Sequence, residues 1–223
     1  MSEIIKLNNV KKKFVSGTEE VRVLEGINLE VRRGDFITIT GPSGSGKSTL
    51  LNIMGGLLHP DEGEVLLEGK SLYEYQDKEL ARIRNEKIGF IFQFHHLLVD
   101  FTVLENLAIP LLMKGRDLKE AYREAERLLS IVDLRERIYA KPRTLSGGEC
   151  QRVAILRAII TQPILLLADE PTGDLDEAHA EVVLKMIKEI HIERGMTVVL
   201  VSHNERVAQM GKKIYNLSGG RLR

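Results

Sequence analysis

Short apolar runs and amphipathic stretches follow one another along most of the chain, and each kind predicts a different element. Residues 36–40 and 164–168 are strand-length runs of mainly apolar or β-branched residues, as expected of strands buried on both faces. Residues 50–54 follow a glycine-rich loop and predict a helix, and residues 177–194 repeat apolar residues at helical spacing. The residues expected to face inward from this second helix are Val182, Val183, Met186, Ile187 and Ile190. Residues 197–201 again predict a strand, so the alternation indicates an α/β protein with a parallel sheet covered by helices.

Two parts of the chain depart from this alternation. Apolar and polar side chains alternate over residues 21–31, and residues 64–67 form another short strand pattern, so the N-terminal part is expected to be rich in β-structure. From about residue 95 to residue 162 apolar residues recur at helical spacing and no strand pattern appears. We therefore expect a helical subdomain over residues 95–162, inserted into a core made of residues 1–94 and 163–223.

The composition limits the possible partners and compartment. The chain has 223 residues with 32 basic and 32 acidic side chains, so net charge gives no general attraction to nucleic acid or anionic lipid. No charge-free apolar stretch reaches the roughly 18 residues of a membrane-spanning helix. The single cysteine cannot form an internal disulfide, and the N-terminus lacks an apolar signal core. We expect a cytoplasmic chain with no nucleic-acid partner and no direct insertion into a membrane.

A phosphate-binding loop is the most specific motif in the sequence. Its residues, which fit the pattern G-x-x-x-x-G-K-[ST] between a strand and a helix, are Gly41, Pro42, Ser43, Gly44, Ser45, Gly46, Lys47 and Ser48. The glycines let backbone N–H groups surround phosphate oxygens, and the helix N-terminus adds a favourable dipole. Lys47 is expected to reach the β- and γ-phosphates, and the Ser48 hydroxyl to bind Mg²⁺. The alternative interpretation is a glycine-rich turn before a helix.

Further candidate residues lie where strand patterns end. A buried strand pattern runs into Asp169 and Glu170, and ligands collect at the carboxyl ends of parallel strands. Asp169 is expected to bind Mg²⁺, and Glu170 to act as the general base for the attacking water. Gln93 and His203 end two other strand patterns at the same edge, and the Gln93 amide is a further candidate ligand of Mg²⁺. The alternatives are solvated acids in a turn and a structural Gln and His.

Residues 145–149 begin another amphipathic helix and contain two superposed signals. Ser146 and Glu149 fit a capping box, which is a sufficient structural reason for the pair. Gly147 and Gly148 leave bare N–H groups at a helix N-terminus, which is a second phosphate-binding surface. With this segment, the chain resembles the ATPase subunits of ABC transporters, whose signature is usually written LSGGQ. The resemblance covers essentially all of residues 1–223 as one ATPase domain.

The resemblance implies a fold and a mechanism. The fold is that of a P-loop NTPase, with a RecA-like parallel sheet core, an antiparallel β subdomain and an inserted helical subdomain. ATP with Mg²⁺ is then held between the phosphate loop of one subunit, including Thr49, and the signature of a second, so that ATP-bound subunits form a homodimer. The signature residues implied to bind ATP are Ser146, Gly147, Gly148 and Glu149.

Four further residues gain roles from the same resemblance. Gln93 matches the Q-loop, and His203 matches the switch histidine that acts with Glu170 in catalysis. Asp176 lies in the loop that couples the two sites of the dimer. Phe14 matches the aromatic residue that stacks on adenine, although an isolated aromatic residue is equally compatible with a core position.

Within the family, residues 92–106 are similar to the lipoprotein-releasing ATPases, with the macrolide-exporter ATPases as near relatives. This implies a peripheral subunit at the cytoplasmic face of the inner membrane that drives the release of lipoproteins toward the outer membrane. Integral membrane subunits would be contacted near Phe94, His95, His96, Leu97 and Leu98. Read without the resemblance, the two histidines are a polar loop near a domain boundary.

Three other functions remain as alternatives. A macrolide or peptide exporter differs from lipoprotein release only in the segment 92–106. Soluble ABC-type ATPases of DNA repair carry long coiled-coil heptads, and ribosomal ones carry two cassettes, neither of which this sequence shows. Small-molecule kinases with a phosphate loop lack residues 145–149.

Three positions depart from the family pattern. Glu149 replaces the usual Gln, as is common in this subgroup, and Asp174 stands where Asn is usual. Cys150 stands where Arg or Gln is expected, and we expect a neutral change on the helix surface.

Overall fold

The computed structural model describes residues 2–17 and 19–223 and contains a large and a small sheet. The large sheet has the strand order β10-β9-β3-β8-β7-β6. Its strands are β3 (Phe36–Thr40), β6 (Ile88–Ile91), β7 (Leu165–Asp169), β8 (Thr197–Ser202), β9 (Lys213–Ser218) and β10 (Arg221–Leu222). β6, β7, β8, β3 and β9 pair in parallel, and β10 is antiparallel to β9. The expected parallel sheet is therefore confirmed.

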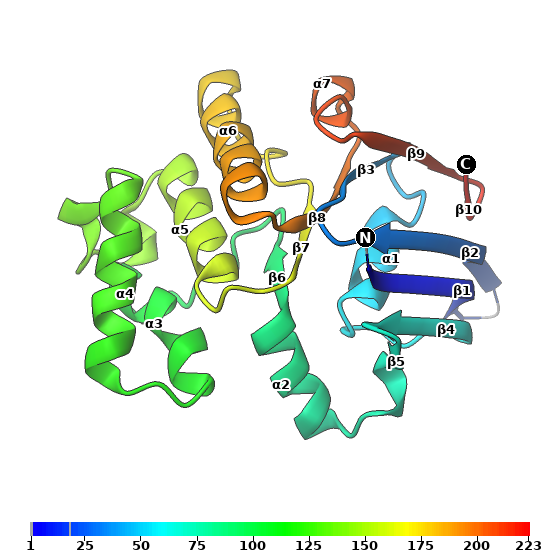
Figure 1. The fold of residues 1–223 in the computed structure, drawn as a ribbon. Helices are drawn as coiled ribbons and strands as arrows, with labels where there is room; N and C mark the ends of the chain where they lie inside the picture. The colour runs from blue at the N-terminus through cyan, green and yellow to red at the C-terminus, as the bar shows by residue number, and fades with distance from the viewer. Residues whose placement is uncertain (1, 18) are drawn as a thin grey trace.

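The small sheet is antiparallel and comes from the N-terminal part of the chain. Its strands are β1 (Glu3–Ser16), β2 (Glu19–Arg32), β4 (Glu62–Leu67) and β5 (Lys70–Ser71), in the order β2-β1-β4-β5. The predicted strand 21–31 lies inside β2, whereas β1 was not expected as a separate strand. In Figure 1 this sheet lies beside α1 (Lys47–Met54), on the opposite side of the large sheet from most other helices.

Helices and turns make up the chain between β6 and β7. The structure places α3 (Val103–Met113), α4 (Leu118–Ile131) and α5 (Gly147–Ile159) there, with short 3₁₀ turns at Arg135–Arg137 and Pro142–Thr144. The other helices are α2 (Asp77–Lys87), α6 (Glu177–Arg194) and α7 (Glu205–Ala208), and Leu72–Glu74 is a third 3₁₀ turn. Among the described helices none has the length and apolar character to cross a bilayer.

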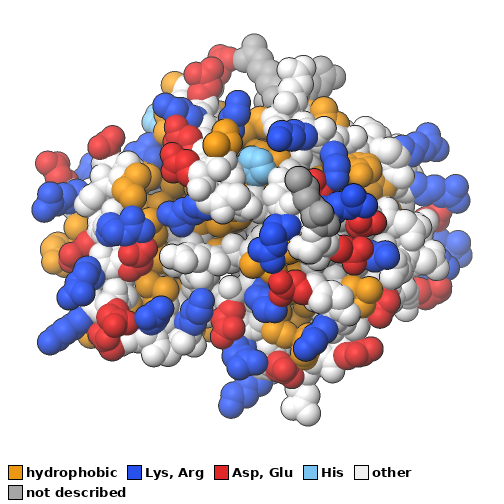
Figure 2. Space-filling model, viewed as in Figure 1, with side chains coloured by type: hydrophobic (Ala, Val, Ile, Leu, Met, Phe, Trp, Pro, Cys, Tyr) orange, Lys and Arg blue, Asp and Glu red, His pale blue; other side chains and the backbone are white. Residues whose placement is uncertain are grey.

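The large sheet is buried on both faces, which is why its strands are apolar throughout. On β7, Leu165 and Leu167 contribute to a core shared with α1 and the small sheet, whereas Leu166 and Ala168 contribute to a core shared with α3 to α6. Hence α1 and α5 pack against opposite faces of this sheet (Figure 1). The surface is different, because basic and acidic side chains are interspersed on the face that Figure 2 shows.

One inward-facing prediction on α6 is wrong. Val183 is buried, but Val182 is 46% exposed. Consecutive residues of a helix point about 100° apart. Val182 therefore lies at the edge of the buried stripe that contains Val183, Met186 and Ile190. Val182 instead lines a groove between α4, α5 and α6.

Candidate active site

The phosphate loop joins β3 to α1, and its backbone conformation requires glycine at two positions. Gly41 has φ 155°, and a Cβ atom there would meet the Leu217 carbonyl oxygen at 2.3 Å. Gly46 has φ 98°, and its Cβ would meet a Val23 methyl group at 2.7 Å. The loop therefore lies tightly between β9 and β2, and only glycine fits at these two positions.

Backbone N–H groups and a hydroxyl group at the start of α1 are available to bind a ligand. Gly46 is the N-cap of α1 and offers no side chain, so within the described chain the first N–H groups receive no side-chain cap. The Ser45 Oγ atom is buried, and among the described residues it has no hydrogen-bond partner. Unsatisfied donors at a helix N-terminus favour an anionic ligand such as phosphate.

Lys47 is a buried cation whose ammonium group lies across the loop. Its side chain is 7% exposed, and Nζ donates hydrogen bonds to the carbonyl oxygens of Gly41 (2.9 Å) and Pro42 (3.0 Å). Nζ also lies 3.9 Å from Oε1 of Glu170. The charge is thus held beside the loop, where phosphate oxygens would meet it.

Ser48 and Asp169 come together at the carboxyl edge of the large sheet. The Ser48 hydroxyl donates to Oδ1 of Asp169 at 3.1 Å. Burial raises the pKa of the Asp169 carboxyl, and the nearby Glu170 adds to this, while the Ser48 hydrogen bond and Lys47 oppose it. A hydroxyl and a partly buried carboxylate are oxygen donors of the kind that Mg²⁺ prefers. In the described chain no three His, Cys, Asp or Glu side chains cluster as metal ligands; Mg²⁺ commonly takes one or two protein ligands, with water and phosphate for the rest.

Glu170 and His203 also meet at this edge. The Glu170 carboxylate accepts hydrogen bonds from the Ser202 hydroxyl (3.1 Å) and the His203 backbone N–H (3.0 Å), and His203 Nδ1 lies 2.9 Å from Oε1. Glu170 itself has φ 43°, in the left-handed region that non-glycine residues rarely adopt. Its own N–H bonds to the Val201 carbonyl at 3.0 Å, which fixes this conformation against β8. Backbone held in this way aims a side chain at a functional site.

Gln93 lies at the same edge, beside the loop that follows Glu170. A Cβ atom at Gly173 would be 3.2 Å from Nε2 of Gln93. The structure therefore gathers the amide, the two acids, the histidine, Lys47 and Ser48 around the ends of β3, β6, β7 and β8. Thr49 follows Ser48 within α1.

The signature segment forms the N-terminus of α5. Ser146 Oγ accepts from the Glu149 N–H (3.2 Å), and the Glu149 carboxylate accepts from the Ser146 N–H (2.8 Å), so the expected capping box is present. The hydrogen bond from the Ser146 N–H to the carboxylate, with contributions from the Ser146 hydroxyl and Arg137, lowers the pKa of Glu149. Gly148 packs closely on α6, because a Cβ atom there would lie 2.5 Å from the His179 ring. Gly147 has more room, with Leu175 at 3.6 Å.

Two other predicted site residues lie at exposed positions. Asp176 is the N-cap of α6 and accepts from the His179 N–H at 2.9 Å, while its other oxygen lies 2.7 Å from His179 Nδ1. Phe14 on β1 is 43% exposed, with the Lys12 ammonium 5.7 Å from its ring centre. Phe14 is therefore not a core residue. It pairs with Val21 on β2, the strand whose Val23 contacts the phosphate loop.

The residues expected to contact membrane subunits lie in an irregular segment, residues 94–102, which we call the partner segment. Phe94 is 64% exposed, and Leu98, Val99 and Phe101 are exposed as well, whereas Leu97 packs on the core. Burial lowers the pKa of His95, although Asp174 and the Gly147 backbone act in the other direction. The segment thus presents an apolar surface close to the signature.

Sequence reasoning missed the residues that hold these segments in place. They are Asn106, Gln151, Arg157 and His179. Each forms hydrogen bonds to, or packs against, backbone whose position a local sequence pattern does not predict. Cys150 is partly exposed on α5, and burial of the rest of its side chain raises the pKa of its thiol. The one signal in the sequence was Asn106, which with Glu105 is a polar residue in a largely apolar helical run.

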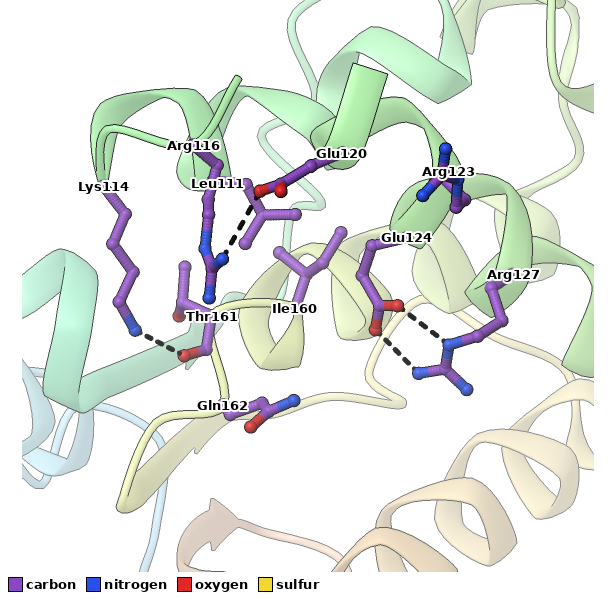
Figure 3. A pocket seen from close by; sticks show the side chains of 10 residues that line it. All are labelled: Leu111, Lys114, Arg116, Glu120, Arg123, Glu124, Arg127, Ile160, Thr161 and Gln162. Carbon is purple, nitrogen blue, oxygen red and sulfur yellow. Dashed lines mark hydrogen bonds and ion pairs between the residues drawn. The ribbon is translucent and has the colours of Figure 1, made fainter. Parts of the chain in front are cut away.

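A concave pocket of about 490 Å³ lies away from this edge, between α3, α4 and the end of α5 (Figure 3). Its two carboxylates already have partners. Glu124 forms two hydrogen bonds with Arg127, at 2.7 and 2.8 Å, and Glu120 lies 3.4 Å from Arg116. The Lys114 ammonium donates to the Thr161 carbonyl at 3.1 Å. Among the described residues that line this pocket, none is a predicted catalytic residue.

A phosphate loop, an acidic strand end and a glycine-rich signature helix on one parallel sheet define an ATP-binding P-loop protein. Residues 24–173 match the family model described as ABC transporter. The chain belongs to the ABC transporter family and is an ATP-binding subunit with ATPase activity.

Relatives and solved structures match nearly the whole chain. The lipoprotein-releasing system ATP-binding protein LolD of Geobacter metallireducens is 46% identical, over 100% of this chain and 99% of its own length. LolD of Aquifex aeolicus is also 46% identical, over 100% and 97%. The dimeric ATP-binding cassette MJ0796, in a post-hydrolysis state bound to ADP and Pi, is 41% identical with a TM-score of 0.92, covering 99% of this chain and 97% of that one. The expected family and fold are confirmed.

Proposed function

We propose that this chain is the ATPase subunit of a lipoprotein-releasing transporter, bound peripherally at the cytoplasmic face of the inner membrane. The observation that carries the proposal is the match over full length to relatives named as lipoprotein-releasing ATP-binding proteins. The exposed apolar side chains of the partner segment support it, because a subunit that drives membrane proteins needs a surface on which they dock. Phe94, His95, His96, Leu97 and Leu98 would form the centre of this contact.

The residues at the sheet edge divide the chemistry among them. Glu170 acts as the general base for the attacking water, with His203 and Gln93 placing the reacting groups. Lys47 and the N–H groups of residues 41–49 bind the phosphates. Ser48, Asp169 and Gln93 would hold Mg²⁺, which would neutralise charge on the phosphate oxygens when bound. Phe14 stacks on the adenine ring.

ATP is proposed to join two copies of the chain. Because α1 and α5 pack on opposite faces of the large sheet, the signature is not placed to close over the phosphate loop of its own chain. A second copy supplies Ser146, Gly147, Gly148 and Glu149 to the γ-phosphate side, with Asp176 near the contact. Hydrolysis then removes the contact that favours the closed dimer, and the dimer opens.

The division of the chain follows from this mechanism. Residues 1–94 and 163–223 form the core that binds ATP, and residues 95–162 form a helical subdomain. That subdomain carries both the signature and nearly all of the partner segment. A movement of the signature on ATP binding would thereby reach the membrane subunits.

The first test removes the proposed base. Glu170→Gln keeps the hydrogen-bond acceptor but not the basicity, so ATP binding should persist while turnover falls by about 10²- to 10⁴-fold. ATP-dependent dimers should then accumulate in size-exclusion chromatography. Glu181→Gln on the exposed face of α6 is the matched control and should turn over normally. Normal turnover in the Glu170 variant would show that the base lies elsewhere.

The second test addresses the cargo. Membrane subunits that copurify with the chain are reconstituted in proteoliposomes with a lipoprotein or with a macrolide. We expect ATP-dependent release of the lipoprotein with the wild-type chain and none with Glu170→Gln. Transport of the macrolide, without lipoprotein release, would favour the exporter alternative.

A further inference from the structure

The partner segment keeps a defined shape without belonging to a strand or a helix. One end is fixed by Asn106 of α3, whose side chain is fully buried. Its Oδ1 accepts from the Leu98 N–H at 2.8 Å, and its Nδ2 donates to the carbonyl oxygens of Leu98 (3.0 Å) and Thr102 (2.9 Å). A single side chain thus replaces the backbone ladder that the segment lacks.

The other end is fixed by Arg157 of α5. Nη1 donates to the His96 carbonyl at 2.7 Å and Nη2 donates to the His95 carbonyl at 2.9 Å. Burial lowers the pKa of the Arg157 guanidinium, although the group stays charged at neutral pH. Among the described residues it has no carboxylate partner, so two neutral carbonyls are its hydrogen-bond acceptors. Losing either bond would leave a desolvated charge, which ties the positions of His95 and His96 to the helix.

The same helix begins at the signature and touches the catalytic edge. α5 runs over Gly147–Ile159 with Ser146 as its N-cap. Near its start, the buried Gln151 donates from Nε2 to the Pro171 carbonyl at 2.7 Å, immediately after Glu170. Near its end, Arg157 holds the partner segment. One rigid element therefore connects the signature, the backbone beside the base and the membrane-facing loop.

We propose that Arg157 is a positioning residue that makes the partner segment move with the signature helix. The proposal rests on the proposed function, because it gives the segment a role in contacting membrane subunits. When ATP draws Ser146 to Gly148 toward a second copy, α5 shifts, and the forked guanidinium carries the carbonyls of His95 and His96 with it. Without the Arg157 guanidinium, the signature still binds ATP, but the partner segment no longer moves with α5.

A role in coupling differs measurably from a role in folding. Loss of a folding residue lowers every activity in parallel with the amount of folded protein. Loss of Arg157 should leave the KM for ATP and the basal kcat of the isolated chain near wild type. The stimulation of ATPase by membrane subunits should fall by roughly 2- to 30-fold, the range typical of coupling residues.

The first experiment needs no membrane subunit. Amide hydrogen exchange is measured in the Glu170→Gln background with and without ATP, comparing Arg157 with Arg157→Met and Arg157→Lys. We expect ATP to slow exchange at residues 146–149 in all three chains. At residues 95–102, ATP should change hydrogen exchange fully in the chain with Arg157 and not at all in Arg157→Met. Arg157→Lys should show a partial change, because an ammonium group lacks the two parallel donors of the guanidinium.

The matched control is Arg152→Met. Arg152 lies on the same helix, and its Nε has no hydrogen-bond partner among the described residues. The control also removes a guanidinium group from α5, but one that does not contact the partner segment. ATP should therefore still change hydrogen exchange at residues 95–102. An Arg157→Met chain that behaves like this control overturns the proposal.

The second experiment uses the complex with the membrane subunits that copurify with the wild-type chain. We expect Arg157→Met to bind these subunits and to lose stimulation while basal ATPase persists. Equal losses of basal and stimulated rates would indicate a folding role and overturn the proposal. If the wild-type chain itself is not stimulated, the proposed membrane function fails and the coupling role fails with it, whereas a stimulated wild type that exports another cargo leaves the role of Arg157 supported.

Discussion

At the scale of single residues, the structure depends on a few buried or partly buried polar side chains that form hydrogen bonds to backbone. Asn106, Gln151 and Arg157 each reach a carbonyl oxygen of a loop and not another side chain. An unsatisfied buried polar group costs about 1–3 kcal/mol, more than a made hydrogen bond contributes. The two fully buried residues, Asn106 and Gln151, should therefore tolerate substitution poorly, although neither touches the proposed nucleotide.

Asn106→Leu tests this with a side chain of similar volume. The change leaves the Leu98 N–H and several carbonyl groups without their partner, so we expect the free energy of unfolding to fall by about 2–4 kcal/mol in urea titration. Asn85→Leu on α2 is the control, because Asn85 makes one hydrogen bond, to the Pro110 carbonyl. It should cost about 1 kcal/mol. Equal losses in the two variants would contradict the importance given to Asn106.

Asp169→Asn separates stability from chemistry. Because burial raises the pKa of Asp169 in the folded chain, stability is lost as pH rises from the unfolded pKa, about 4, through the folded one. At pH 7 the Asn variant should melt about 2–4 °C higher without nucleotide, and below pH 4 the difference should vanish. Mg²⁺-dependent ATPase should be lost at all pH values.

The control for this prediction is Asp100→Asn in an exposed turn, which should keep Mg²⁺-dependent ATPase activity. A lower melting temperature of Asp169→Asn at pH 7 would show that the carboxylate stabilises the ligand-free fold.

The residues of the candidate active site could be predicted from sequence, but the polar residues that hold the neighbouring segments could not. Asp169 and Glu170 lie at the end of one strand pattern, and Lys47 and Ser48 follow the glycine-rich loop after another, so topology brings all four to one edge. Arg157 sits at a helical position whose contact lies 61 residues away at His96. Tertiary packing sets the positions of the carbonyl groups that Arg157 binds, and no periodic pattern in the sequence indicates that packing.

At the scale of elements, the contact between α5 and α6 sets the position of the signature. Gly148 lies against the ring of His179, which is itself bonded to Asp176. The two helices approach this closely only because Gly148 has no side chain. Val182 shows the limit of sequence patterns here: a period of 3.6 residues defines a stripe, but neighbouring helices decide how wide it is.

Gly148→Ala should push α5 away from α6. We expect a loss of about 1–3 kcal/mol in thermal or urea unfolding, as for other overpacked sites. Gly147→Ala is the control, because its Cβ would meet Leu175 at an ordinary 3.6 Å. Adding His179→Ala to Gly148→Ala should restore most of the stability. A double variant as unstable as the single one would mean that the contact is not the cause.

At the scale of the whole molecule, α1 and α5, which begin at the two proposed halves of one nucleotide site, pack on opposite faces of one sheet. Basic and acidic residues are equal in number and are interspersed on the face shown in Figure 2, so that face carries no charge of a single sign that would orient a second copy. Shape and ATP are therefore the expected determinants of how two copies meet. The strand order, by contrast, was beyond sequence reasoning, because parallel strands pair across long intervals of chain.

Ser146→Arg tests the shared site. The long cation at the start of α5 should block the second copy, so ATPase activity should fall by more than about 10²-fold, since a misplaced contact at a reacting group can cost that much. Nucleotide binding by the isolated monomer, followed by fluorescence titration, should be unchanged. Ser130→Arg on the exposed face of α4 is the control and should remain active. Loss of monomer binding in Ser146→Arg would place the serine in the site of its own chain.

The position of β3 has a consequence for how the protein is made. β3 carries the phosphate loop, yet both its neighbours are synthesised much later: Gly34, just before it, bonds to Thr197, 163 residues on, and Thr40 to Tyr215, 175 residues on. A chain still on the ribosome thus holds an apolar strand with two open edges, while α3 to α5 are already complete. The loop gains its supports, Leu217 among them, only when β9 has emerged. We therefore expect a chain that lacks β9 to bind ATP weakly and not to compete for the dimer.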